Sequence, residues 1–329
     1  MKTVGLTYDL KTDYRFKEGD PPDANAEYDH PSTIDVISQA IEVSGFKVKR
    51  IGNVQSLLEQ IDSLGVDIVF NISEGTVGRN RESQVPILLE MHGIPFVGSD
   101  ALTLGVTLDK IMAKKLFIAD GISTPRFFEI RSLDQLIETD HMQFPMIVKP
   151  RFEGSSKGLS EKSRVANKEE LAHQVEFVVN TYKQPALVEE FIVGTEFTVA
   201  VISNDPPEVL PVVQIRIDGN LELGKEFYTF ARISSDRLEY VCPAPIGAAL
   251  HKEISDMSLR VYNAVECLDF GRIDFRVDAK GKPYVLEINP LPSLSTEDVF
   301  MLIAKTQGMT YPQMINRILT SALARYAIT

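Results

Sequence analysis

Two segments near the C-terminus, GRIDFRV at residues 271–277 and PYVLEIN at residues 283–289, alternate charged or amide side chains with apolar ones. The stretch between them contains Lys280 and Gly281, so the pattern predicts an antiparallel hairpin with these two residues as its loop. The predicted cross-strand pairs are Arg272 with Asn289, Asp274 with Glu287, and Arg276 with Val285. The opposite face then carries only apolar side chains, namely Ile273, Phe275, Val277, Tyr284, Leu286 and Ile288.

The polar face of this hairpin predicts a cation site. Directly opposed carboxylates, here those of Asp274 and Glu287, lie about 5 Å apart and repel each other. Together with Asn289 they form a set of oxygen ligands that suits Mg²⁺, with Mn²⁺ as a substitute, because such ions accept one or two carboxylates and take their other ligands from water or phosphate. The alternative is a solvated face on which Arg272 and Arg276 neutralise the two acids, since charged sheet faces are common.

The charge balance limits the partners of the chain. Its 329 residues include 46 acidic and 34 basic side chains, for a formal net charge of −12, which disfavours binding to nucleic acid or to an anionic membrane. No apolar run approaches the roughly 20 residues of a membrane span, and we expect no signal peptide. Because Cys242 and Cys267 are the only cysteines, we expect neither a disulfide framework nor a zinc site, and a cytoplasmic location.

Apolar runs alternate with amphipathic stretches in the first hundred residues and predict an open parallel sheet with helices. A helical segment follows at residues 101–121, and residues 126–190 are typical of a small α+β unit. Further apolar runs at 195–203, 209–217 and 226–233 predict an antiparallel sheet that ends in the hairpin. We therefore expect a mixed α/β and α+β fold with three domains, at residues 1–100, 101–190 and 191–329.

Two further segments are suited to binding a nucleotide. FPMIVKPRFEGSSKG, residues 144–158, places Lys149 at the end of a buried strand, before a loop whose small residues let backbone N–H groups approach phosphate oxygens. The segment at 186–197 sets two acids beside apolar side chains, a surface suited to adenine, and Glu196 beyond them is suited to ribose hydroxyls. The alternatives are a surface loop beside an ordinary lysine and a half-buried strand with solvated acids.

Taken in order, these motifs resemble those of the ATP-grasp superfamily and, within it, the D-alanine–D-alanine ligase family. The resemblance runs from about residue 65 to about residue 300. It is carried by GSDALTLGVTLDK, FPMIVKPRFEGSSKG, VEEFIVGTEFTVAV, FYTFARI, CPA, GRIDFRVD and LEINPLP. A single motif can arise by chance, whereas so many in one order are specific.

The resemblance implies ATP as a substrate and a set of residues that bind it. Lys110, Lys149 and Arg232, the last in place of a family lysine, would contact phosphates. Glu189, Glu190, Ile192 and Glu196 would hold adenine and ribose, and the loop with Glu153, Ser155 and Ser156 would close over the triphosphate. The family's magnesium ligands correspond to Asp274, Glu287 and Asn289, in agreement with the hairpin register.

The resemblance also implies a reaction in two steps. A carboxylate attacks the γ-phosphate of ATP to form an acylphosphate, and an amine then attacks the acylphosphate to give an amide. Arg272 and the backbone N–H of Ser293 would stabilise the tetrahedral oxyanion. Ser155 would link to an N-terminal glutamate that orients the ammonium group of the first substrate, for which Glu27 is the candidate. The family acts on small amino acids in peptidoglycan biosynthesis, and its members are commonly homodimers.

The chain departs from the family pattern around the amino-acid site. Glu74 lies in the segment that replaces the family's histidine region, while Arg79 and Arg81 either bind a substrate carboxylate or form surface ion pairs. Asp298 stands where a carboxylate-binding serine is expected, and it would repel a free substrate carboxylate. Ligase chemistry is thus better supported than specificity for D-alanine.

Three functions follow from these patterns. The leading prediction is a ligase of the D-alanine–D-alanine type or a relative with other amino-acid substrates. An ATP-grasp kinase is a second candidate, although a kinase has no tetrahedral oxyanion for Arg272 to stabilise. A nucleotide-binding protein without turnover is a third, although such a protein would be expected to lose part of the metal-binding set.

Overall fold

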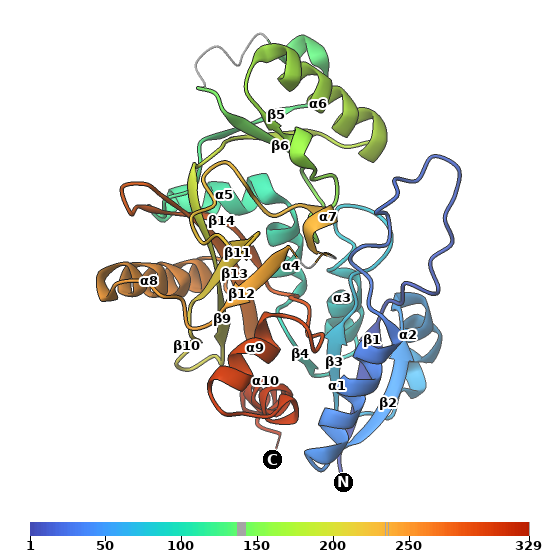
Figure 1. Cartoon of the computed structure of the whole chain (residues 1–329). Helices are drawn as coiled ribbons and strands as arrows, with labels where there is room; N and C mark the ends of the chain where they lie inside the picture. The colour runs from blue at the N-terminus through green and yellow to red at the C-terminus, as the bar shows by residue number, and fades with distance from the viewer. Residues whose placement is uncertain (137–142, 234, 236, 329) are drawn as a thin grey trace.

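The computed structural model describes residues 1–136, 143–233, 235 and 237–328. Within these residues the chain forms three sheets with helices packed against them (Figure 1). Among the same residues, no helix combines the length and the apolarity that crossing a membrane requires.

The first sheet belongs to the N-terminal part of the chain and is parallel throughout, in the order β2-β1-β3-β4. This confirms the predicted open parallel sheet. Its elements are β1 (Thr3–Tyr8), α1 (Pro31–Val43), β2 (Lys47–Gly52), α2 (Val54–Gln60), β3 (Ile68–Ile72), α3 (Gln84–Met91) and β4 (Phe96–Val97). Helix α1 begins at Pro31, where the missing N–H costs no hydrogen bond, and it buries Ile34, Ile37 and Ile41 at helical spacing.

The second sheet is antiparallel, in the order β5-β8-β6-β7, and forms the upper lobe in Figure 1 together with α6. Its elements are β5 (Phe127–Ile130), β6 (Met146–Pro150), β7 (Arg164–Val165), α6 (Lys168–Tyr182) and β8 (Ala186–Glu190). Leu171 and Val175 of α6 share one apolar core with Met146 and Val148 of β6. Before this sheet, α4 (Ala101–Leu108) and α5 (Lys110–Ala119) connect it to the N-terminal part.

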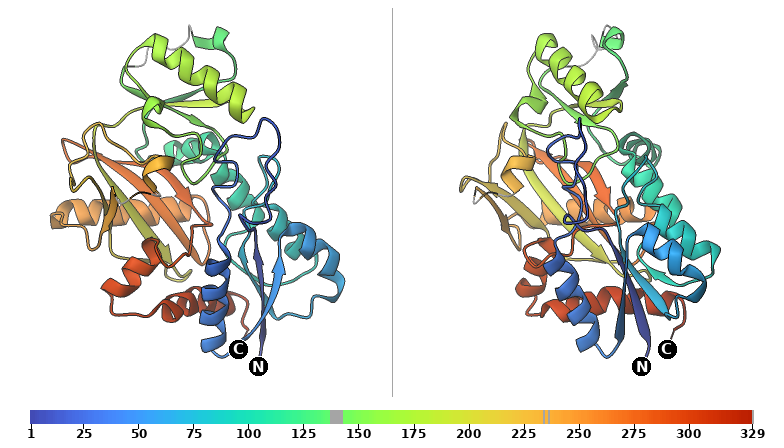
Figure 2. Two further views of the ribbon diagram at one scale, coloured as in Figure 1. Left: turned by 45° about the vertical axis from the view of Figure 1, so that its right-hand side comes forward. Right: turned by 90° about the vertical axis from the view of Figure 1, so that its right-hand side faces the viewer.

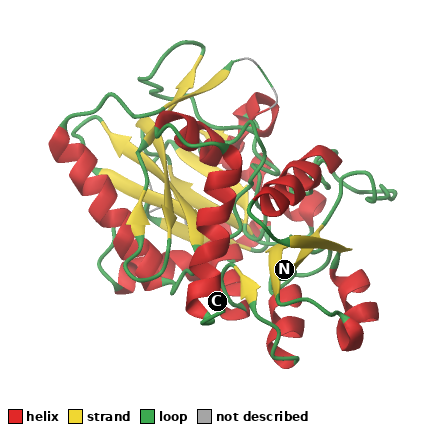
Figure 3. Ribbon diagram, turned by 90° about the horizontal axis from the view of Figure 1, so that it is seen from below, coloured by secondary structure: helices red, strands yellow, loops and turns green. Residues whose placement is uncertain are grey.

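The third sheet is the largest and antiparallel, in the order β12-β11-β9-β13-β14, with β10 paired to β9. Its strands are β9 (Gly194–Ile202), β10 (Glu208–Val209), β11 (Val213–Ile217), β12 (Leu238–Val241), β13 (Phe270–Asp278) and β14 (Pro283–Asn289). The helices of this part are α7 (Phe230–Ile233), α8 (Ala248–Ala264), α9 (Val299–Thr306) and α10 (Tyr311–Arg325). Figure 3 shows these strands bordered by helices.

Packing leaves one face of β13 free for polar side chains. On the covered face, Ile273 and Phe275 lie in one core with Phe117 of α5 and Val261 of α8. The C-terminal helices α9 and α10 pack against both the first and the third sheet, since Phe300 and Ile315 share a core with Phe70 of β3 and Phe270 of β13. Both views of Figure 2 accordingly place the two chain termini side by side.

Two predictions about single elements are wrong. Residues 101–121 form two helices instead of one, because Asp109 takes an extended conformation and its side chain caps α5 by accepting a hydrogen bond from Met112 N at 3.3 Å. Part of the predicted strand at 226–233 is the short helix α7. The ring of Phe227 packs on Phe191 at 5.6 Å between centroids, so its burial does not come from a place in a sheet.

Candidate active site

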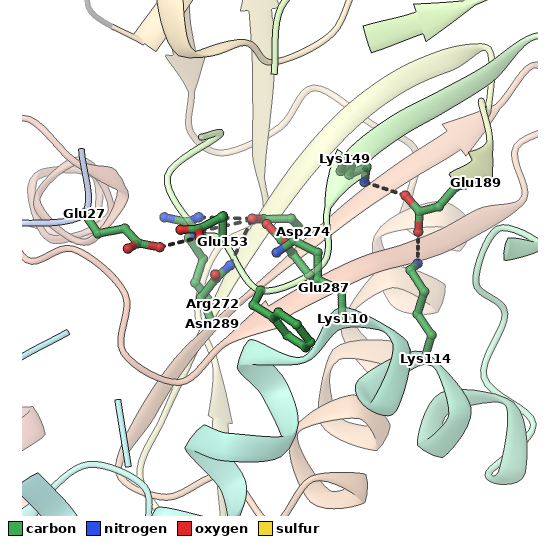
Figure 4. Close-up of polar contacts among 12 residues, drawn as sticks. Glu27, Lys110, Lys114, Lys149, Glu153, Glu189, Arg272, Asp274, Glu287 and Asn289 are labelled. Atoms are coloured by element: carbon green, nitrogen blue, oxygen red, sulfur yellow. Dashed lines mark hydrogen bonds and ion pairs between the residues drawn. The ribbon is translucent and has the colours of Figure 1, made fainter. Parts of the chain in front are cut away.

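The β13–β14 hairpin pairs Asp274 with Glu287 and Arg272 with Asn289, as predicted. Asp274 is held by its neighbours on the same face. It accepts hydrogen bonds from Thr198 Oγ1 on β9 at 2.6 Å, from Asn289 Nδ2 at 3.2 Å, and from Arg272 Nε and Nη2 at 3.1 and 3.0 Å. Two carboxylates, an amide and a guanidinium therefore converge on one sheet face (Figure 4).

The predicted loop of this hairpin is wrong by one residue. Asp278 N–H donates to Lys282 O at 3.0 Å, so residues 279–281 form a three-residue loop. Arg276 consequently faces Tyr284 and not Val285. A bulge beyond Asp274 leaves Leu286 without a cross-strand partner and restores the predicted register at the site.

The bulge also changes which residues of β14 face the core. Val285 is fully buried there, whereas Tyr284 and Leu286, predicted on the apolar face, are half-buried. Ile273, Phe275, Val277 and Ile288 lie in the core, as predicted. The alternation of polar and apolar residues could not reveal the bulge, because the residue it inserts is itself apolar.

Lys110 reaches the hairpin from the first position of α5. Its Nζ lies 2.6 Å from Glu287 Oε2. Burial raises the pKa of Glu287, but Lys110 and then Lys149 lower it, and the result is a pKa of about 2. Glu287 is therefore an ionised carboxylate over the whole physiological range.

Lys149 and Lys114 approach the same carboxylate, that of Glu189 (Figure 4). Lys149 Nζ lies 2.5 Å from Glu189 Oε2, and Lys114 Nζ lies 2.5 Å from Oε1 and 2.7 Å from Thr124 Oγ1. Burial alone would raise the pKa of Glu189, but the two lysines lower it. Lys114 was missed by the sequence prediction, although it stands four residues after Lys110, on the same face of α5.

The predicted adenine and ribose side lies along β8 and β9. Glu190 pairs with Arg126 at 2.7 Å, and Ile192 is half-buried. Glu196 pairs with Arg276 at 3.2 Å, and the Arg276 guanidinium also lies over the ring of Phe191, 4.6 Å from its centroid. Burial raises the pKa of Glu196, and Arg276 lowers it less than burial raises it.

The Gly/Ser loop after Lys149 is fastened to the N-terminal part of the chain. Glu27 accepts hydrogen bonds from Gly154 N at 2.5 Å, Arg81 Nη2 at 2.7 Å and Lys157 Nζ at 3.2 Å. Glu153 pairs with Lys157 and accepts a hydrogen bond from Gln184 Nε2 at 2.7 Å. Both oxygens of Glu27 thus have partners inside this cluster, and Figure 4 shows Glu27 beside Glu153.

A second contact reinforces this fastening. Asp23 accepts hydrogen bonds from Gly158 N at 2.8 Å and from Tyr182 Oη at 2.9 Å. Ser155 and Ser156, in the middle of the loop, both have positive φ, and Ser155 is exposed. The sequence predicted neither hydrogen bond of Asp23, because the segment around Asp23 has no periodic pattern and its position depends on the tertiary structure.

The remaining arginines of the region form ion pairs. Arg81 is buried against Glu27 and Glu153, and Arg79 lies 3.0 Å from Asp109. Arg232 pairs with Glu226 and donates to Phe227 O at 2.8 Å. Arg79 thus forms an ion pair at the surface, one of the two alternatives, whereas the ion pairs of Arg81 are buried.

Asp109 and Ser293 complete the description of the site. Asp109 is fully buried and binds the Arg151 guanidinium through both oxygens, at 2.7 and 2.6 Å, a pairing that was not predicted. Ser293 is exposed on the segment that follows β14. No group of three or more His, Cys, Asp or Glu side chains suited to a metal occurs among the described residues, so a cation on the hairpin would have two carboxylates and one amide from the protein.

Two surface hollows lie outside this cluster. One, of about 530 Å³, is lined by residues 61–66 with His92 and Ile94. The other, of about 450 Å³, lies near the hairpin loop, and its lining includes Val193, Phe197, Gln214, Ile246 and Asp278. Neither is lined by Asp274, Glu287, Lys110, Lys114 or Lys149.

Comparison with known proteins gives a consistent result. The family model described as D-ala D-ala ligase C-terminus matches residues 116–320. A protein of Sinorhizobium fredii, described as "Uncharacterized protein y4sG", is 39% identical over 259 residues, which are 79% of this chain and 75% of the relative. D-alanine–D-alanine ligase of Syntrophotalea carbinolica is 32% identical over 290 residues, 88% of this chain and 90% of that enzyme.

Solved structures agree on the fold. The crystal structure of D-alanine–D-alanine ligase from Bacillus anthracis complexed with ATP superposes with a TM-score of 0.76 at 22% identity, covering 98% of this chain and 97% of that one. Fold and site together define an ATP-grasp ligase, an enzyme that forms carbon–nitrogen bonds. The chain belongs to the D-alanine–D-alanine ligase family. The predicted family and fold class are thereby confirmed.

Proposed function

We propose that this enzyme uses ATP to join the carboxylate of one amino acid to the amine of a second substrate, in the manner of D-alanine–D-alanine ligase. The observation that carries the proposal is the convergence on the hairpin. Asp274, Glu287 and Asn289 share its polar face with Arg272, and Lys110 reaches Glu287 from another element.

In the first step, a carboxylate oxygen of the donor substrate attacks the γ-phosphorus of ATP. The bond between that phosphorus and the bridging oxygen breaks, and ADP leaves with the electron pair. Phosphoryl transfer depends mainly on positioning and charge neutralisation, which Lys110 and Lys149 supply as cations. Glu189 and Lys114 hold the Lys149 ammonium in place, with charged atoms 2.5 Å apart in each pair.

The oxygen atoms of Asp274, Glu287 and Asn289 fit a hard divalent cation such as Mg²⁺ or Mn²⁺. These residues would hold the ion, which when bound would neutralise triphosphate charge. We assign Glu190, Ile192 and Glu196 to the adenine and ribose side, and Glu153, Ser155, Ser156 and Arg232 to the phosphate side.

In the second step, the amine of the acceptor attacks the acyl carbon of the acylphosphate. The carbon–nitrogen bond forms, the carbon–oxygen bond to phosphate breaks, and the nitrogen loses a proton. Arg272 remains a cation throughout: burial lowers its pKa, but Asp274 and Asp298 together raise it above its usual range. It is therefore suited to the oxyanion that develops in this step, together with the backbone N–H of Ser293.

Glu27 was predicted to orient the donor's ammonium group. Its contacts with Gly154, Arg81 and Lys157 favour a role in holding the phosphate loop.

We propose domain boundaries near residues 100 and 190. The first and second of these domains would then contact each other where Glu27 binds the phosphate loop. We also propose a homodimer through α3 and α4, where Ile87, Met91 and Leu102 are exposed.

Hydroxylamine trapping tests the proposed function. The enzyme is incubated with ATP, Mg²⁺ and a panel of D- and L-amino acids, with and without hydroxylamine, which intercepts an acylphosphate as a hydroxamate. We expect hydroxamate and ADP with at least one amino acid. A stable phosphoester without hydroxamate would indicate a kinase, and the absence of ADP would indicate a binding protein.

A further inference from the structure

Arg276 is the third polar residue on the site face of β13. It follows Arg272 and Asp274 at two-residue spacing, and its cross-strand partner on β9 is Glu196, the carboxylate that we assign to ribose. The side chain is deeply set, with 3% of the residue exposed. A buried charge is costly unless it is paired and hydrogen-bonded, so the acceptors around this guanidinium decide how it is held.

Four acceptors bind the Arg276 guanidinium among the described residues. Nη1 donates to Glu196 Oε2 at 3.2 Å and to Glu226 O at 3.1 Å. Nη2 donates to Gly194 O and to Gly224 O, both at 3.1 Å. Because three of these acceptors are uncharged backbone carbonyls, Glu196 is the one among them that neutralises the guanidinium. The two charges are thus bound to each other in the interior.

The backbone around Arg276 leaves little room for another position of the guanidinium. Gly194 begins β9 so close to β13 that a Cβ atom at this residue would lie 1.9 Å from Val277 O. Gly194 N also donates to Gly224 O at 3.2 Å, which fixes the second carbonyl relative to the first. Because these two carbonyls hold Nη2, Arg276 is fixed by the backbone, and Glu196 in turn is fixed by Arg276.

Arg276 also contacts the side of the site that we assign to adenine. Its guanidinium lies over the ring of Phe191, 4.6 Å from the centroid, and Phe191 directly precedes Ile192. Phe191 shares one apolar cluster with Phe227 and Ile147. A guanidinium that binds a carboxylate and stacks on an aromatic ring has both its charge and its plane fixed. Arg276 thus connects the adenine side of the site with the ribose side.

Glu196 can accept further hydrogen bonds beyond those from the chain. Burial raises its pKa, whereas Arg276 and a hydrogen bond from the backbone N–H of Tyr228 lower it. An ionised carboxylate accepts about four hydrogen bonds in all. The contacts with Arg276 and Tyr228 therefore leave room for other donors, such as the two neighbouring hydroxyls of a ribose.

We infer that Arg276 is a positioning residue for the nucleotide, which fixes Glu196 in the orientation that receives the ribose hydroxyls and so makes the enzyme selective for ribonucleotides. The inference rests on the proposed function, which assigns Glu196 to ribose. A nucleotide that lacks a ribose hydroxyl leaves this buried acceptor without its donor. A site built to bind a hydroxyl rejects an analogue without it strongly, because a buried polar group then stays unpaired.

The wild-type enzyme tests the selectivity. Hydroxamate formation is measured with ATP, 2′-deoxy-ATP or 3′-deoxy-ATP as the nucleotide and with a donor that gives hydroxamate with ATP. We expect kcat/KM for ATP to exceed that for at least one deoxy analogue about 10- to 100-fold, the effect of losing a hydrogen bond to a charged acceptor. The difference should lie mostly in KM, because the ribose is remote from the reacting atoms.

Two variants test the role of Arg276. Arg276→Met keeps an unbranched stem beside Phe191 and removes the guanidinium. We expect the KM for ATP to rise about tenfold, the preference for ATP over the deoxy analogue to shrink about tenfold, and kcat to change less than about threefold. Arg276→Lys keeps a cation for Glu196 but lacks the planar fork that binds the carbonyls, so its preference should lie between those of Arg276→Met and the wild type.

Arg260→Met is the matched control, at an exposed position where the guanidinium donates to Asp120 O. It should change neither the KM for ATP nor the preference for ATP. Thermal unfolding shows which variants are folded. If Arg276→Met does not fold, Arg276→Lys takes its place, and the wild-type preference is decisive whether or not either variant folds.

The outcomes separate this inference from the proposed function. Equal use of ATP and both deoxy analogues by the wild type overturns the inference. An equal rise in KM for ATP and its analogues in a folded Arg276 variant does the same, because it shows a structural role alone. Both results leave the ligase standing, whereas failure to form hydroxamate with any donor overturns the proposed function itself.

Discussion

Lys114 and Glu189 form an ion pair in which both side chains are almost completely buried, at 1% exposure each, and their charged atoms lie 2.5 Å apart. The pair joins α5 to β8 and therefore joins two parts of the chain. Because Lys149 contacts the other oxygen of Glu189, the same pair also fixes a lysine that we assign to ATP.

Lys114→Met should weaken both stability and nucleotide binding. Removing one partner of a buried pair typically costs about 3–5 kcal/mol, and the remaining Glu189 charge will hold Lys149 more tightly. We expect the KM for ATP to rise about tenfold, because a weaker charge-assisted contact between Lys149 and ATP costs about 1–2 kcal/mol of binding free energy. Steady-state kinetics and urea unfolding measure the two effects.

The neighbouring Lys115 is exposed, so Lys115→Met is a matched control that should change neither quantity. The double variant Lys114→Met with Glu189→Gln also breaks the pair of Glu189 with Lys149. It should be less stable than Lys114→Met alone, because it leaves the buried Lys149 ammonium unpaired. Equal stability of the two variants would show that the pair contributes little.

Glu27→Gln should loosen the phosphate loop. The amide cannot balance Arg81 and Lys157 together, and it accepts the hydrogen bond of Gly154 N less strongly than a carboxylate does. We expect trypsin to cleave after Lys157, which is 8% exposed in the wild type, several times faster. Glu18→Gln, at an exposed position of the same N-terminal segment, should not change the cleavage rate. If trypsin cleaves both variants at the wild-type rate, Glu27 does not hold the loop in place.

The sequence predicted the parts of the site that depend on local pattern. The register of Asp274 with Glu287 follows from strand alternation, which a one-residue slip would violate, and the structure has that register. Lys149 near the end of β6 was predicted from the apolar run before it and the Gly/Ser loop after it. Both predictions follow from local patterns that the sequence displays directly.

The contacts that the sequence could not predict join segments far apart in the chain. Asp23 contacts Gly158, and Asp109 binds Arg151, across loops whose course depends on packing. The bulge at Leu286 was hidden for a different reason, because an inserted apolar residue leaves the composition of the strand unchanged. Charge pairing within the site is thus a tertiary property. Helical spacing indicates that Lys110 and Lys114 lie on one face of α5, but not that they contact Glu287 and Glu189.

Asp29 should make the protein less stable as the pH rises. Its pKa is about 7 in the folded chain and 3.8 in its ordinary state, so between these values the folded state binds more protons than the unfolded state. The free energy of unfolding therefore falls from about pH 4 to about pH 7 and then levels off. Because Asp29 is partly exposed, we expect the contribution to be about 1–2 kcal/mol.

The variant Asp29→Asn lacks this titration. It should match the wild type at pH 4 in urea unfolding and be more stable at pH 8, whereas Asp13→Asn, at an exposed position, should follow the wild type at both values. A loss of stability at pH 8 in Asp29→Asn would mean that the ionised carboxylate has a favourable partner.

Glu287→Gln should preserve the fold and remove nearly all ATP turnover. The amide keeps the size of the side chain and can still accept a hydrogen bond from Lys110, but it withdraws one of the two negative charges that face each other on the hairpin. If these charges hold a divalent cation, as we propose, ADP release should fall at least about 100-fold. Glu222→Gln, at an exposed position, is the control for the chemical change alone. Thermal unfolding within a few degrees of the wild type would establish that the variant is folded, and ADP release near the wild-type rate in such a protein would place the cation elsewhere.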